Sequence, residues 1–112
     1  MEVKIKVIKV PVGSDPFVVE IDNGLSAMQE NVGGGLIQIV EVDIGGVVFD
    51  LVCNEEGLLN GMEYNRTVGG HHIHGPFFLA HHDEDGNTTS VNPNDINKLV
   101  RSIPDGSVRT RV

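Results

Sequence analysis

The sequence lacks the features of several protein classes. It holds a single cysteine, so the chain cannot form an internal disulfide. It has no run of about 18 apolar residues that could span a membrane, and no secretion signal at its N-terminus, so we expect a cytoplasmic protein. Basic residues are scarce, with 8 Lys and Arg against 16 Asp and Glu and a formal net charge of −8. That excess of acid argues against binding to nucleic acid or to an anionic membrane, because both require a cationic surface.

The acidic charge is concentrated in the middle of the chain. Residues 10–65 contain ten acidic side chains and neither lysine nor arginine. A region of one sign can simply keep a small protein soluble, or it can present a surface to a basic partner. The sequence alone leaves both interpretations open.

Motifs of established enzyme classes are absent as well. The sequence has no phosphate-binding loop, no G-x-G-x-x-G fingerprint, no H-E-x-x-H motif and no paired cysteines. Cys53 follows an apolar segment, which favours a buried small side chain over a nucleophile. We therefore expect a protein that binds rather than catalyses.

Hydrophobic periodicity predicts a single small α+β domain over residues 1–112. We expect an antiparallel or mixed sheet of about five strands and two helices. The strands are expected at residues 3–10, 17–22, 36–42, 47–53 and 73–82, and a short one could follow at 108–112. The first two strands should form one hairpin, and the next two should form another around Gly45-Gly46.

Two segments carry helix signals. Residues 25–32 follow a candidate cap at Asn23 and end at Gly33-Gly34-Gly35, since glycine tolerates the left-handed conformation at a helix end. Residues 93–103 begin with Asn92 and Pro93, a cap followed by proline at the first helical position.

A long segment without periodicity, residues 54–70, connects the fourth and fifth strands. Loops of this length in compact domains often carry function. Its asparagines can hydrogen-bond to backbone groups of the loop, and Arg66 can pair with a neighbouring acidic side chain. Alternatively, the asparagine amides and Arg66 could hold a small anionic ligand such as a nucleotide. The candidate ligand- or partner-binding residues are Asn54, Glu55, Glu56, Asn60, Asn65 and Arg66.

All five histidines lie between His71 and His82. On a strand, His72 and His74 would share one face, a spacing that suits a divalent transition metal. His82 could add a third ligand only if a bulge or a neighbouring strand shortened the gap. Exposed histidines without any metal are the simpler interpretation.

Three short motifs carry a resemblance to a known family. They are Val32-Gly33-Gly34 at a helix end, the loop NEEGxxNGxxxNR from Asn54 to Arg66, and Gly75-Pro76-Phe77 before the last helix. Over residues 21–100 the chain resembles an uncharacterised small domain of phages, plasmids and integrative elements of Gram-positive bacteria. The resemblance implies a mobile-element accessory protein inside the bacterial host, with no established reaction. The histidine cluster departs from the pattern.

We therefore expect a non-catalytic accessory protein that binds a host factor, for instance a defence component, through an acidic face and the 54–70 loop. One alternative is a protein that binds or sequesters a small nucleotide-like ligand through Arg66 and the loop asparagines. Another is a metal-binding protein that uses the strand from His71 to His82. A homodimer is compatible with the sequence, because an exposed terminal strand could pair symmetrically.

Overall fold

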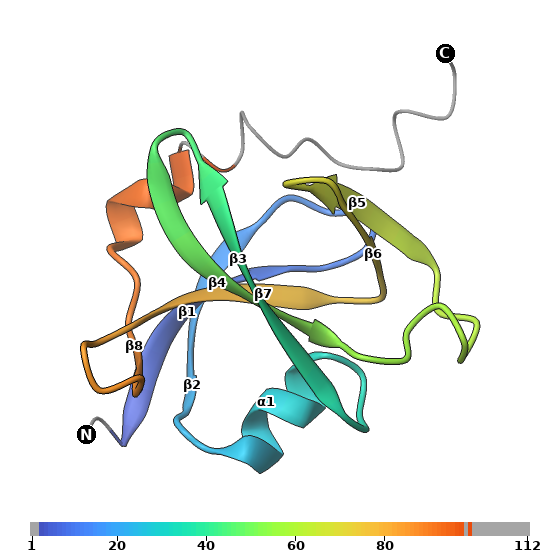
Figure 1. The fold of residues 1–112 in the computed structure, drawn as a ribbon, viewed down its shortest axis with the longest axis horizontal. Helices are drawn as coiled ribbons and strands as arrows, with labels where there is room; N and C mark the ends of the chain where they lie inside the picture. The colour runs from blue at the N-terminus through green and yellow to red at the C-terminus, as the bar shows by residue number, and fades with distance from the viewer. Residues whose placement is uncertain (1–2, 98, 100–112) are drawn as a thin grey trace.

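The computed structural model describes residues 3–97 and residue 99. The described residues form a main sheet of six strands, with the order β2-β1-β7-β4-β3 and with β8 paired to β7 (Figure 1). Its strands are β1 (Lys4–Val10), β2 (Phe17–Asp22), β3 (Ile37–Ile44), β4 (Val47–Asn54), β7 (Phe77–His82) and β8 (Thr88–Thr89). A separate two-stranded sheet pairs β5 (Tyr64–Val68) with β6 (His71–His74), and helix α1 spans Leu25–Asn31.

Two antiparallel hairpins confirm the strand pairing predicted from the sequence. β1 pairs with β2, and β3 pairs with β4 in a register that places Ile44 opposite Val47. Gly45 and Gly46 make the second turn with φ of +61° and +87°. A two-residue hairpin turn of this kind requires positive φ at both positions, which glycine adopts without steric cost.

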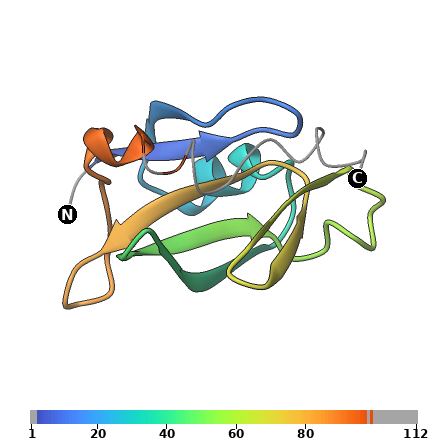
Figure 2. The ribbon, with the colours of Figure 1, turned by 90° about the horizontal axis from the view of Figure 1, so that it is seen from above.

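Each face of the main sheet packs in part against a different part of the chain. On one face, Met28 of α1 and Val32 pack in a cluster with Val52 and Phe78 of the sheet. The opposite face is covered by the β5–β6 hairpin and by the segment that follows β8. Its cluster includes Val68, Ile73, Val91 and Leu99 together with Ile8, Phe49, Leu51, Phe77 and Leu79. Figure 2 shows the strong twist of the sheet and the β5–β6 hairpin at one end of it.

The described structure is mostly β, so the predicted α+β fold with about five strands and two helices is wrong. Among the described residues it holds one complete α-helix, α1, and two sheets. The predicted strand at residues 73–82 is two strands, β6 and β7, because the chain turns at Gly75 (φ +89°) and Pro76 cannot donate a backbone hydrogen bond. The segment at residues 54–70, which was predicted to be irregular throughout, contains strand β5.

The second predicted helix begins differently from the expectation. Pro93–Asp95 forms a single 3-10 turn, in which the Asn92 side chain accepts a hydrogen bond from the backbone N–H of Asn94. Ile96, Asn97 and Leu99, which follow the turn, are α-helical, as predicted. Residues 98 and 100–103 of that predicted helix, and the strand predicted at 108–112, lie outside the described residues.

Helix α1 confirms the predicted position of the first helix but not its cap. Its N-cap is Gly24, which makes no side-chain cap, and Leu25 on its first turn is exposed. The glycines after the helix all have positive φ, and the N–H of Gly34 bonds to the carbonyl of Gln29 at 2.7 Å. These glycines therefore end the helix as predicted. No helix in the described part of the chain is long and apolar enough to cross a membrane.

Candidate functional site

Asn54 joins the start of the 54–70 segment to the end of α1. Its side-chain amide donates to the carbonyls of Val32 (3.1 Å) and Gly34 (2.6 Å), and its Oδ1 accepts from the N–H of Glu56 (2.9 Å). The side chain is buried. Asn54 thus supplies the helix end and the loop with hydrogen-bond partners that buried backbone requires.

Asn65 and Arg66 do the same at the other end of the segment. The Asn65 amide donates to the carbonyls of Val10 (2.9 Å) and Gly75 (3.0 Å), and its Oδ1 accepts from Arg66 (2.6 Å). The Arg66 guanidinium, whose residue is only 1% exposed, also donates to the carbonyls of Pro11 and Ser14 in the β1–β2 turn. These contacts give both side chains a structural role beneath that turn.

Met62 holds the three motifs of the sequence together. A β-carbon at Gly33 would lie 2.7 Å from Cε of Met62, and one at Gly75 would lie 2.5 Å from its sulfur. A side chain at either position would force the flexible end of Met62 to move. The sequence-based prediction did not include Met62. The signal that could have indicated it is the presence of glycines in the motifs that precede and follow it in the chain.

A cleft of about 630 Å³ lies between the ends of β3 and β4 and the β5–β6 hairpin. The lining residues are Gln38, Val40, Cys53, Asn54, Glu55, Gly57, Leu58, Tyr64, Gly70, His71, His72, Ile73 and His74. Among them Cys53 and Ile73 are buried and apolar. Burial raises the pKa of the Cys53 thiol, which keeps it protonated and a poor nucleophile near neutral pH.

Two of the three histidines predicted to bind metal line this cleft. His72 Nδ1 lies 2.7 Å from Oγ1 of Thr67, which lies 2.6 Å from the hydroxyl of Tyr64. The ring of Tyr64 meets that of His74 edge-on at 5.6 Å. His82 is elsewhere, at the end of β7, where it bonds to Asp50. The structure therefore does not bring His72, His74 and His82 together.

The loop segment that lines the cleft through Glu55 and Leu58 carries exposed apolar and acidic side chains. Leu58 is 70% exposed and Leu59 is 84% exposed, and the acidic residues on either side of them are exposed as well. We call this surface the loop face; it consists of Glu55, Glu56, Leu58, Leu59 and Glu63. The sequence-based prediction included Glu55 and Glu56 but not Leu58 and Leu59. The signal that could have indicated the leucines is a pair of consecutive apolar residues in a polar loop.

Comparison with known proteins places the chain in one family. Residues 5–103 match the profile of DUF3846, a domain of unknown function. The chain belongs to the DUF3846 family. The match confirms the predicted membership of an uncharacterised domain family, whereas the mobile-element setting stays a prediction. No curated protein and no solved structure matches this DUF3846 chain.

The six predicted binding residues of this DUF3846 domain fall into two groups. Asn54, Asn65 and Arg66 are buried in contact with backbone, whereas Glu55, Glu56 and Asn60 are exposed, and Glu55 lines the cleft. The exposed group is available to a partner. The buried group shapes the loop that presents it.

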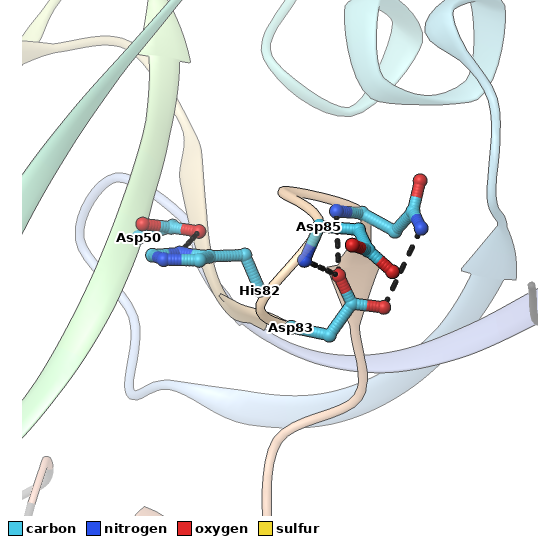
Figure 3. Close-up of polar contacts among 5 residues, drawn as sticks. Asp50, His82, Asp83 and Asp85 are labelled. Carbon is cyan, nitrogen blue, oxygen red and sulfur yellow. Dashed lines mark hydrogen bonds and ion pairs between the residues drawn. The ribbon is translucent and has the colours of Figure 1, made fainter.

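His82 of the DUF3846 domain is expected to titrate above the ordinary histidine value. Its Nδ1 lies 2.8 Å from Oδ2 of Asp50 (Figure 3), and that hydrogen bond and the Asp50 charge raise the pKa of His82 above 6.5. The pair therefore stabilises the folded state fully below about pH 6.5, and this contribution is lost as the pH rises through the raised pKa. NMR titration of the imidazole should give a midpoint above 6.5 that falls in Asp50→Asn; an unchanged midpoint in that variant would contradict the pairing.

Proposed function

We propose that this DUF3846 domain is a non-catalytic binding protein whose loop face and adjoining cleft take an apolar, basic segment of a partner protein. The observation that carries the proposal is the exposed pair of consecutive leucines, Leu58 and Leu59, of which Leu58 lines the cleft. Apolar side chains exposed together and bordered by polar ones are typical of protein interaction sites. A side chain of the partner could enter the cleft, where Val40 and Ile73 offer apolar surface.

Charge indicates the chemistry of the partner. The loop face carries three glutamates, and residues 10–65 contain no lysine or arginine to neutralise them. Opposite charges across an interface speed the encounter and exclude partners of the wrong sign. We therefore propose a partner segment in which lysine or arginine flanks an apolar residue.

A small-ligand function is a weaker candidate. The cleft volume suits a small molecule. The sequence-based version of this hypothesis gave the central role to Arg66, yet its guanidinium donates to backbone carbonyls and to Asn65. A nucleotide in the cleft would instead meet Glu55, whose charge repels phosphate.

The setting that we propose follows from the motif resemblance described above. In that setting the domain is an accessory protein of a phage or other mobile element, it acts in the bacterial cytoplasm, and its partner is a host protein. Binding that partner, for instance a defence component, would be its whole action, without a reaction.

Selection of peptides tests the proposal and does not require an identified partner. We expect a displayed library of random peptides, selected against the purified domain, to yield sequences that combine an apolar residue with lysine or arginine. Their affinity should fall at least about tenfold in the double variant Glu55→Lys/Glu56→Lys, because the new lysines repel the basic residues of the peptide. A similar loss is expected in Leu58→Ser, which removes an apolar side chain that the peptide contacts.

A matched charge reversal serves as the control. Glu20→Lys/Glu30→Lys makes the same change of net charge on exposed residues of β2 and α1, and should leave the affinity within about twofold. Equal loss in both double variants would show that only net charge matters. Recovery of peptides that bind every variant equally well would contradict the proposed surface.

A further inference from the structure

Three side chains from three strands converge on the α1 side of the main sheet. Glu41 lies directly opposite Asp50 in the β3–β4 register, and Asp50 lies opposite Ala80 in the β4–β7 register. His82 comes two residues after Ala80, so its side chain points to the same face. One ligand atom from each of Glu41, Asp50 and His82 lies within 4.8 Å of the other two.

This arrangement places two carboxylates where they repel one another. Like charges directly opposite on neighbouring strands destabilise a sheet. Neither β3, β4 nor β7 contains a lysine or arginine that could offset them. The face also stays open beyond α1, since Ile39 is 52% exposed and Val48 is 49% exposed. A cation at this point would remove the repulsion and would be reachable from solvent.

We propose that Glu41, Asp50 and His82 bind a divalent transition-metal ion of the zinc type. One imidazole nitrogen and two carboxylate oxygens are ligands that zinc accepts. Tetrahedral bonds of about 2.0–2.2 Å from such an ion would hold the three donor atoms about 3.3–3.6 Å apart. Nδ1 of His82 and Oδ2 of Asp50 are already 2.8 Å apart. Small side-chain rotations would complete the site and leave a coordination position open to water.

The ion and a proton compete for the same nitrogen. When His82 is protonated, its Nδ1–H donates to Asp50; bound metal takes the lone pair of Nδ1 instead and releases that proton. The charged groups that act on His82 are Asp50, Glu41 and Asp83, all acidic. Asp83 is engaged in its own turn, where its Oδ1 accepts from the N–H groups of Asp85 and Asn87 at 2.9 Å (Figure 3). Affinity for the metal should therefore rise with pH as His82 loses its proton.

The site differs from the three-histidine metal site considered from the sequence. It keeps His82 but replaces His72 and His74, which line the cleft, with two carboxylates from β3 and β4. It is also independent of the proposed function, because no residue of the loop face takes part.

Calorimetric titration of the untagged protein with zinc chloride tests the site. At about pH 7.5 we expect one ion per chain, and an affinity at least about tenfold weaker in His82→Ala and in Glu41→Gln. Glu41 is exposed, so its conservative variant keeps the fold while it removes a ligand. Binding should also weaken steadily from about pH 8 to pH 6, as protons displace the ion from His82.

Two histidine variants separate this site from its competitors. His71→Ala removes an exposed histidine of β6 and should bind zinc as the wild type does. His72→Ala/His74→Ala should likewise retain the ion. Wild-type affinity in both His82→Ala and Glu41→Gln would overturn the proposal, as would loss of zinc in the His72→Ala/His74→Ala variant alone.

Discussion

Replacement of Asn65 by alanine should lower the free energy of unfolding by about 2–4 kcal/mol, since each buried polar group left without its partner costs about 1–3 kcal/mol. Asn65 is fully buried, and its amide donates to the carbonyls of Val10 and Gly75. Its Oδ1 accepts from the buried Arg66 guanidinium. Alanine removes all three hydrogen bonds and has no side-chain group that could take the place of the amide.

Urea unfolding followed by circular dichroism measures this loss. Asn60→Ala is the matched control, because Asn60 belongs to the same segment but is exposed. Its free energy of unfolding should change by less than about 0.5 kcal/mol. Equal stability of the two variants would show that the buried amide contributes nothing, contrary to the structural role that we assign to it.

The variant Gly57→Ala should displace the loop from β6 and lower the free energy of unfolding by about 1–3 kcal/mol, the usual cost of overpacking. A β-carbon at Gly57 would lie 2.5 Å from the carbonyl oxygen of His74. This oxygen belongs to the backbone of a strand, so it cannot turn aside as a flexible side chain would. The loop face and β6 must then separate, and the cleft between them changes shape.

Amide shifts in the NMR spectrum and urea unfolding report both effects. We expect shift changes at residues 71–74 and weaker binding of the selected peptides, although no residue of the loop face has been replaced. Gly24→Ala is the control, because Gly24 has φ of −161° and open space around its α-carbon. Unchanged stability and unchanged β6 shifts in Gly57→Ala would show that loop and strand are not in the close contact described.

The sequence predicts those parts of the fold that local signals specify. Both hairpins follow from alternation and from turn residues such as Gly45-Gly46, and the end of α1 follows from its glycines. Strand β5 escaped prediction because its alternation fails. A register shift falls between Tyr64 and Arg66, and the successive residues Asn65 and Arg66 are both buried. Polar residues buried side by side do not resemble a strand with one apolar face.

The candidate site shows a similar limit. The sequence indicates the 54–70 segment and its polar residues, but it does not show which of them are buried. Arg66 bonds to Pro11 and Ser14, more than 50 positions earlier in the chain, and only the tertiary structure brings them together. Likewise, counting from the Gly45-Gly46 turn places Glu41 opposite Asp50, but His82 joins them through the β4–β7 pairing, which no local pattern specifies.

The central claim is that the loop face and cleft form the binding surface of this DUF3846 domain. The most direct test is a map of backbone amide shifts in the ¹⁵N-labelled protein during titration with a selected basic, apolar peptide. We predict that the largest changes fall on residues 55–64 and 71–74, around Leu58 and the cleft. Changes confined to α1 and β2, with the cleft residues unaffected, would contradict the account.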